Sequence, residues 1–333
     1  MAAGAHILAP AGPVLGADEA RFFRDAAPWG FILFARNIET PEQVRRLTRA
    51  LREAVGRDAP ILIDQEGGRV QRMRAPHWHE WEPPLIQVER DGTERSMFLR
   101  GRLIGAELRD LGIDANCAPS ADIAFPETHP FLQNRCYGRD VETVVTMARA
   151  MAEGLSASGV LPVIKHAPGH GRATLDSHKA LPRIGVSLDA LIATDFATFS
   201  ALSDLPMAMT AHIVVEALDP SRPATQSPET LTYLRNEIGL EMLLMTDDIS
   251  MGALSGTIGA RSEAAIAAGC DLVLHCNGNL AEMVEVAAAT PMLDGRRAER
   301  ANAALNARNA PDPIDIPAVV SELGDLLRES AYA

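Results

Sequence analysis

The segment from Lys165 to His178 holds more proton-handling side chains than any other stretch of the sequence. It reads KHAPGHGRATLDSH, with His166, His170 and Asp176 between its two ends. Histidine titrates close to neutral pH, and a carboxylate beside it can hold its tautomer and stabilise its charged form. Side chains of these types at this density predict either a site for acid/base catalysis and ligand binding, or a transition-metal site.

The residues around this cluster predict how it is positioned. The preceding run VLPVI, residues 160–164, is short, apolar and β-branched, which favours a buried strand. Pro168, Gly169 and Gly171 then prevent a regular helix. We therefore expect an irregular, mobile loop that is hinged at the two glycines and carries Asp176 and His178.

Similar short apolar runs recur along the chain with amphipathic segments between them, and this alternation predicts an α/β fold. Eight candidate strands are expected at residues 6–9, 31–34, 61–63, 113–117, 160–164, 207–210, 242–246 and 272–275. Eight rounds of strand and helix favour a closed (β/α)8 TIM-type barrel. An open, doubly wound sheet is the alternative, but no GxGxxG or GxxxxGK[ST] motif is present to cradle a nucleotide.

Helix ends and interruptions divide the rest of the chain. Thr40-Pro41 and Ser227-Pro228 have the features of helix starts. Residues 67–94 and 120–140 break the alternation and are expected to be loops on the face where a barrel keeps its active site. The whole chain, 1–333, is expected to form one barrel domain whose tail, from about residue 295 to 333, is helical and packs outside the barrel.

Composition limits the classes of function. The 333 residues are 47% hydrophobic and 23% charged, with a net charge of −13 and no basic run, which argues against nucleic acid and anionic membrane as partners. The four cysteines have no CxxC spacing and are expected to be reduced. The start of the sequence has no basic region ahead of an apolar stretch. We expect a cytoplasmic protein, either a monomer or a weak dimer.

Most of the predicted strands end in polar residues. These are Asp64, Asn116, Lys165 and His166, Thr210 and His212, Asp247 and Asp248, and His275 and Asn277. Aspartate and lysine are rarely buried without a partner, so their repeated position after apolar runs is informative. In a barrel these ends converge on one pocket.

The motifs of this sequence resemble those of family 3 glycoside hydrolases, in the branch of bacterial β-N-acetylglucosaminidases. The similarity lies in KHAPGHG at residues 165–171 with DSH at 176–178. Supporting motifs are FARN at 34–37, DQEGGRVQR at 64–72, NRCYG at 134–138, MTAH at 209–212 and TDDISM at 246–251. Ala167 and Thr246 depart from the usual pattern of the family. These departures affect the expected fit of the substrate and leave the expected reaction unchanged.

The resemblance implies a retaining exo-hydrolase that removes terminal β-linked N-acetylglucosamine (GlcNAc) without a cofactor. The implied substrate is GlcNAc-1,6-anhydro-N-acetylmuramic acid (anhydroMurNAc), with or without peptide, in cell-wall recycling. The implied roles are Asp247 as the nucleophile and His178 as the acid/base with Asp176 as its partner. The implied sugar contacts are Asp64, Arg72, Arg135, Lys165 and His166.

Some residues near these motifs are left out of the predicted site. Asp248 is expected to point away from Asp247, because successive side chains alternate along a strand, and to be structural. Arg69, Arg74 and Arg139 are interpreted as members of surface ion pairs.

Two other functions are also compatible with these residues. One is a metal-dependent hydrolase in which His166, His170 and His178, with Asp176, hold a transition metal, although no HExxH motif accompanies them. The other is a sugar-binding protein without turnover. The presence of Asp247 together with Asp176 and His178 argues against the second.

Overall fold

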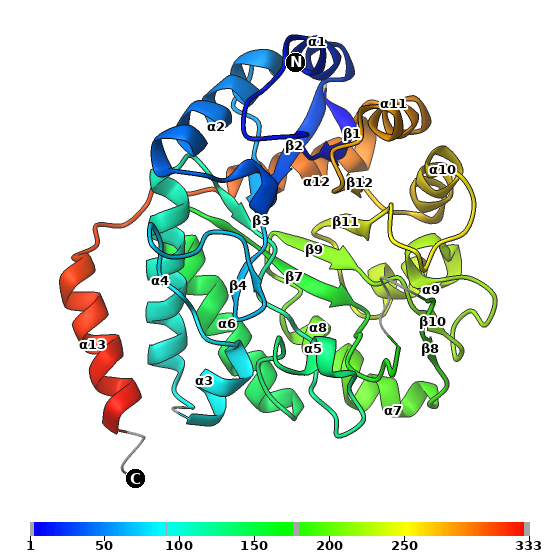
Figure 1. The fold of residues 1–333 in the computed structure, drawn as a ribbon. Coiled ribbons are helices and arrows are strands. Elements are labelled where there is room, and N and C mark those ends of the chain that lie inside the picture. The colour runs from blue at the N-terminus through cyan, green and yellow to red at the C-terminus, as the bar shows by residue number, and fades with distance from the viewer. Residues whose placement is uncertain (1–2, 91, 176–179, 330–333) are drawn as a thin grey trace.

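The computed structural model describes residues 3–90, 92–175 and 180–329. Within them, eight parallel strands close into a barrel in the order β1-β12-β11-β9-β7-β6-β3-β2. Helices surround this sheet on the outside (Figure 1). The predicted TIM-type barrel is confirmed.

The barrel strands overlap the eight predicted segments, with ends that differ by up to three residues. They are β1 (Gly4–Leu8), β2 (Pro28–Leu33), β3 (Ile61–Ile63), β6 (Ala115–Asn116), β7 (Leu161–Ala167), β9 (Met207–Thr210), β11 (Leu243–Asp248) and β12 (Leu272–His275). One difference affects the site. The strand β7 runs on to Ala167, so Lys165 and His166 lie inside the strand and not in the loop after it. Pairing to β9 resumes at Ala167 opposite Thr210 after a register shift between Ile164 and Ala167, so Lys165 and His166 lie at this irregularity of the strand.

Helices lie between and after the barrel strands, and two of them begin at the predicted capping residues. The helices are α1 (Ala17–Ala26), α2 (Pro41–Val55), α3 (Pro84–Arg90), α4 (Glu94–Asp110), α5 (Pro130–Gln133), α6 (Val141–Ala157), α7 (Leu188–Ala193), α8 (Asp195–Ala201), α9 (Pro228–Asn236), α10 (Ile258–Ala268), α11 (Leu280–Ala289), α12 (Gly295–Asn306) and α13 (Ile316–Glu329). Thr40 and Ser227 accept hydrogen bonds from the backbone of the first turns of α2 and α9. Gly56 ends α2 in the left-handed conformation that glycine adopts without strain.

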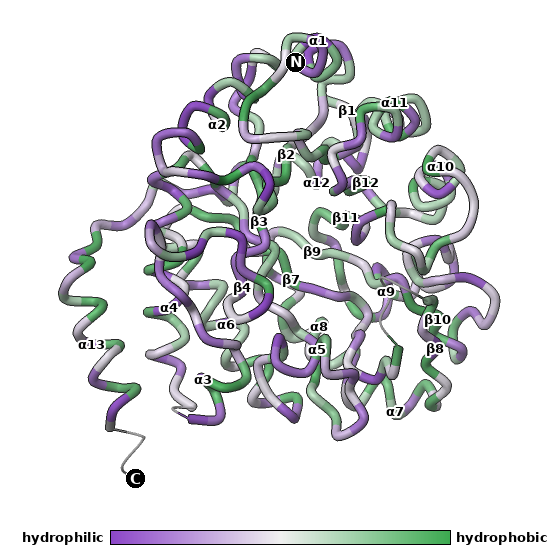
Figure 2. The backbone as a smooth tube through the Cα atoms, viewed as in Figure 1, coloured by the Kyte–Doolittle hydropathy of each residue, from purple (hydrophilic) through white to green (hydrophobic). Residues whose placement is uncertain are grey.

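The core lies inside the barrel and between its strands and helices. Strand residues such as Leu62, Ile164 and Leu244 are fully buried, and each such side chain contributes about 1.5–3 kcal/mol relative to an exposed one. In Figure 2 the hydrophobic colour follows the strands, and β7 turns hydrophilic towards its carboxyl end. Lys165 and His166 therefore place polar groups at the end of the barrel where β7 finishes.

The two segments predicted to be active-site loops both border that end. The first contains a small antiparallel hairpin of β4 (Gln65–Gly67) and β5 (Val70–Gln71), followed by α3. The second contains α5. Past β7, β8 (Arg183–Ile184) pairs with β10 (Val214–Val215) to form a second small sheet. The first two segments contribute cavity-lining side chains, among them Arg69, Val70 and Phe131.

Two helices make up most of the described part of the tail. Helix α12 contributes Ala301 and Ala304 to the core, and α13 lies along α4 at the outside of the molecule (Figure 1). Arg95, in the first turn of α4, donates two hydrogen bonds to the Glu322 carboxylate of α13. In the described residues, no helix is both long and apolar enough to cross a membrane.

Candidate active site

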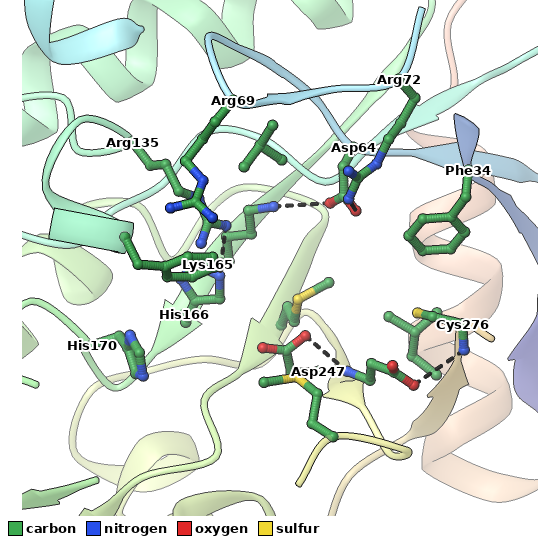
Figure 3. Close-up of a pocket in the computed structure, with 16 residues that line it drawn as sticks. Phe34, Asp64, Arg69, Arg72, Arg135, Lys165, His166, His170, Asp247 and Cys276 are labelled. Carbon is green, nitrogen blue, oxygen red and sulfur yellow. Dashed lines mark hydrogen bonds and ion pairs between the residues drawn. The ribbon is translucent and has the colours of Figure 1, made fainter. Parts of the chain in front are cut away.

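A cavity opens at the carboxyl ends of the barrel strands and brings together residues from most of the chain (Figure 3). Its lining is Phe34, Asp64, Arg69, Val70, Arg72, Phe131, Arg135, Lys165, His166, His170, Met209, Asp247, Asp248, Met251, Leu274 and Cys276. The predicted sugar contacts Asp64, Arg72, Arg135, Lys165 and His166 all lie here, together with Asp247. The structure therefore unites every predicted site residue that it describes.

Asp64 and Lys165 form the centre of a buried ion-pair network. The Asp64 carboxylate, just after β3, accepts a hydrogen bond of 3.0 Å from Lys165 Nζ and one of 2.9 Å from Arg72 Nη2. Burial opposes ionisation of Asp64, but Lys165 and Arg72 outweigh it and hold its pKa well below the usual range. Burial likewise disfavours the charged Lys165, yet Asp64 and Glu66 raise its pKa. Both groups are ionised at neutral pH.

Glu66 extends this network and was given no role by the sequence. It lies in β4, is 2% exposed, and forms an ion pair with Lys165. Arg135 donates from Nε and Nη2 to the two Glu66 oxygens, each at 2.9 Å, in a bidentate pair. Burial would raise the pKa of Glu66, but Arg135 and Lys165 lower it overall. Glu66 thereby fixes the two cations in the cavity wall.

Asp122 holds His166 from behind the cavity. Its Oδ2 is 2.7 Å from His166 Nδ1, while its Oδ1 accepts the His170 backbone N–H at 2.6 Å. His166 Nε2 lies 3.2 Å from Arg135 Nη2, which can only donate. His166 Nε2 must therefore accept, and His166 Nδ1 must carry the proton that it donates to Asp122.

The described part of the loop after β7 packs closely at Gly171. The Gly171 carbonyl accepts from the Thr128 hydroxyl at 2.5 Å, and a Cβ on Gly171 would lie 2.0 Å from the Ile123 carbonyl oxygen. Its φ is outside the left-handed region, so close packing and not the backbone conformation requires glycine here. Gly169 does adopt a positive φ, of 127°.

His170, at the start of this anchored stretch, lines the cavity with a ring that is free to bind. Neither ring nitrogen has a hydrogen-bond partner among the described residues. Burial, with His166 adding to it, lowers the pKa of His170 to about 4. His170 is therefore neutral at physiological pH and can offer one donor and one acceptor to a ligand.

The two aspartates at the end of β11 point in different directions, as strand alternation predicted. Asp247 directs its carboxylate into the cavity, and its Oδ1 accepts the Asp248 N–H at 2.8 Å (Figure 3). Asp248 turns to Ser250 and to the Cys276 backbone N–H, 3.1 Å from its Oδ1. Burial opposes the ionised form of Asp247, but His166 and His212 lower its pKa overall. Asp247 is thus an ionised carboxylate that faces open space.

The other residues named from the sequence have different outcomes. Asp176 and His178 lie outside the described residues. Arg74 and Arg139 pair with Glu80 and Glu89 on the surface, as expected. The interpretation of Arg69 was wrong, because it lines the cavity and makes no ion pair among the residues described.

The sequence reasoning also missed Glu66, Asp122 and Phe131. Glu66 stands inside the DQEGGRVQR motif, where a carboxylate two residues after Asp64 could have been assigned to the same site. Asp122 and Phe131 both lie in the 120–140 segment that was predicted to border the site.

The metal-site alternative conflicts with the surroundings of His166. Its Nε2, the nitrogen nearer the cavity, faces the Arg135 guanidinium, which would repel a bound cation. His178, which that alternative also needs, is outside the described residues. In the part of the chain that the structure describes, no group of three or more histidine, cysteine or acidic side chains is arranged to hold a metal ion.

Comparison with known proteins agrees with this geometry. A family model described as "Glycosyl hydrolase family 3 N terminal domain" matches residues 18–305. The chain belongs to glycoside hydrolase family 3. A "Beta-hexosaminidase" of Methylococcus capsulatus is 37% identical over 274 residues, which cover 80% of each chain. A "Beta-hexosaminidase" of Pseudomonas aeruginosa is 34% identical over 86% of each chain.

A solved structure is similar over nearly the full length. NagZ from Neisseria gonorrhoeae, in complex with N-trifluoroacetyl-D-glucosamine, superposes with a TM-score of 0.85 and 29% identity, and covers 99% of this chain and 98% of that one. These relatives place the chain in the bacterial β-N-acetylglucosaminidase branch of the family. It is a glycoside hydrolase of the β-N-acetylhexosaminidase class.

Proposed function

We propose that this protein is a retaining exo-β-N-acetylglucosaminidase that removes the terminal GlcNAc from GlcNAc-1,6-anhydroMurNAc, with or without peptide, during cytoplasmic recycling of the cell wall. The observation that carries the proposal is an ionised carboxylate, Asp247, facing a cavity whose opposite wall holds a closed network of hydroxyl-binding groups. The class of enzyme is shared with the relatives named above, and the muramic substrate goes beyond them.

The wall network suits the polar end of a sugar. Lys165, Arg72 and Arg135 are fixed by two carboxylates, so their remaining N–H groups stay oriented when a ligand enters. A preorganised wall of this kind binds neighbouring hydroxyls without paying much ordering entropy. His166 and His170 add a donor and an acceptor on the same side. We assign sugar binding to this network.

Asp247 is assigned the role of nucleophile. Its oxygen bonds to the anomeric carbon as the bond from that carbon to the aglycone oxygen breaks, and the aglycone oxygen takes a proton from the acid. Water then attacks the same carbon, returns a proton to the acid, now acting as base, and releases Asp247. The family resemblance assigns the acid to His178, supported by Asp176. The two displacements retain the configuration of the sugar.

Trapping with a fluorinated sugar tests the nucleophile. A 5-fluoro N-acetylglucosaminyl fluoride should leave a covalent adduct that peptide mass spectrometry finds on Asp247. Asp247→Asn should lose the adduct and at least about 10³-fold in kcat. Proton NMR of the first product should show the β-anomer. An adduct on Asp248, or an α-anomer as first product, contradicts the assignment.

Leaving-group dependence tests the acid. His178→Ala should lose most on aryl glucosaminides with poor leaving groups, which require protonation, by about 10²–10⁴-fold, and least on the most acidic phenols. Rate constants for the first step across a graded series of phenols measure this slope. An equal loss across the series would show that His178 only positions the substrate.

A further inference from the structure

Arg69 stands apart from the other cations of the cavity. It follows β4 in the turn to β5 and is exposed at the mouth, whereas Lys165 and Arg135 are buried. Its guanidinium carbon lies 4.2 Å from the centre of the Phe131 ring, and Figure 3 shows the group reaching over the cavity beside Arg135. Among the described residues, it makes no ion pair and no side-chain hydrogen bond.

The other three cations in the cavity wall already have carboxylate partners. Arg72 pairs with Asp64, Arg135 with Glu66, and Lys165 with both. Each of these cations thus has a carboxylate partner within the protein, with three cations sharing two carboxylates, and their remaining N–H groups can contact neutral hydroxyls. Among the described arginines and lysines that line the cavity, Arg69 is the one whose charge has no carboxylate partner. A positive charge without a partner at a ligand site favours an anionic group on the ligand.

The geometry also defines which part of the ligand would reach Arg69. In an exo-acting pocket the terminal sugar occupies the enclosed part, next to Asp247 and the buried network, and the aglycone extends towards solvent. Arg69 and the half-buried Phe131 lie at that solvent side. Stacking on Phe131 restrains the guanidinium plane and leaves its N–H edges free, which suits bidentate binding of a carboxylate.

We propose that Arg69 binds a carboxylate on the aglycone, so that the leaving-group subsite selects an acidic sugar over a neutral one. The inference rests on the proposed function, because the lactyl carboxylate of anhydroMurNAc is the acidic group in question. The proposal assigns selectivity for the lactyl carboxylate to Arg69, whose guanidinium is held by stacking on Phe131. The predicted sugar contacts in the wall have no part in this selection.

The test compares two aglycones that differ in charge and by one methyl group. The substrates are GlcNAc-anhydroMurNAc with a free lactyl carboxylate and the same disaccharide as its methyl ester. For the unmodified enzyme, kcat/KM should favour the acid by about tenfold, the size of a charge-assisted pair at a partly exposed site. In Arg69→Gln the ratio should fall to about one. Arg69→Lys keeps the charge but loses the planar fork, and should give an intermediate ratio.

Arg139→Gln is the matched control. Arg139 is an exposed arginine that pairs with Glu89 away from the cavity, so its replacement should leave the ratio unchanged. A preference for the acid that survives in Arg69→Gln overturns the role of Arg69 while the proposed substrate stands. If the unmodified enzyme cleaves chitobiose but neither muramic disaccharide, both the substrate proposal and this inference fail. Thermal melts of each variant confirm that the fold is intact.

Discussion

Asp122→Asn probes the hydrogen bond that orients His166. Asn keeps the shape of Asp122 but has one oxygen and one NH₂ group. The His170 backbone N–H, 2.6 Å away, always donates, so the Asn oxygen must face it. The NH₂ group then faces His166 Nδ1, which can no longer donate. The proton moves to His166 Nε2, where it meets the Arg135 Nη2 donor at 3.2 Å.

The expected cost follows from this exchange. One buried hydrogen bond to a charged group is replaced by two donors facing each other, which costs about 1–3 kcal/mol. If that cost falls on the transition state, kcat/KM for an aryl N-acetylglucosaminide should decrease by about 5- to 150-fold. Steady-state kinetics on p-nitrophenyl N-acetylglucosaminide measure it, with thermal melts to confirm folding. A variant within twofold of the unmodified enzyme would refute the reasoning.

A double-mutant cycle with His166→Ala separates this effect from general damage. If Asp122 acts through His166, Asp122→Asn should have little further effect once the imidazole is removed, which gives a coupling energy of at least about 1 kcal/mol. An equal loss in both backgrounds would show that Asp122 acts through the loop after β7 instead.

Three further predictions follow from the same structure. EDTA or phenanthroline should leave activity unchanged, and loss that added zinc restores would support the metal alternative. Gly171→Ala should lower the free energy of unfolding by about 1–3 kcal/mol because its Cβ meets the Ile123 carbonyl, as urea titration would show. The pKa of Glu66 is lower in the folded protein than in the unfolded chain, so the unfolded chain takes up a proton at this residue at higher pH. The stability that the ion pairs of Glu66 contribute is therefore present above about pH 4.3 and is lost as the pH falls further. Urea titrations between pH 3 and 6 should therefore show a shallower loss in Glu66→Gln than in the unmodified protein.

Much of the site was determined by local sequence. Apolar runs that end in Asp64, Lys165 and Asp247 predict both the strands and the edge where their side chains emerge, because a parallel barrel aligns the carboxyl ends of all its strands. The capping residues set the helix limits in the same local way. The family motifs then added chemical roles, and for Asp176 and His178 those roles still depend on the resemblance.

Tertiary structure alone decided how the charges pair. Glu66 meets Arg135 across 69 positions, and Asp122 meets His166 across 44. Arg69 stacks on Phe131 at the cavity, although the sequence was interpreted as placing it in a surface ion pair. Periodicity places a residue on a strand, a helix or a loop, but it carries no information on which loops meet. Ion pairing depends on distances of a few ångströms between loops, and packing sets those distances only when the barrel closes.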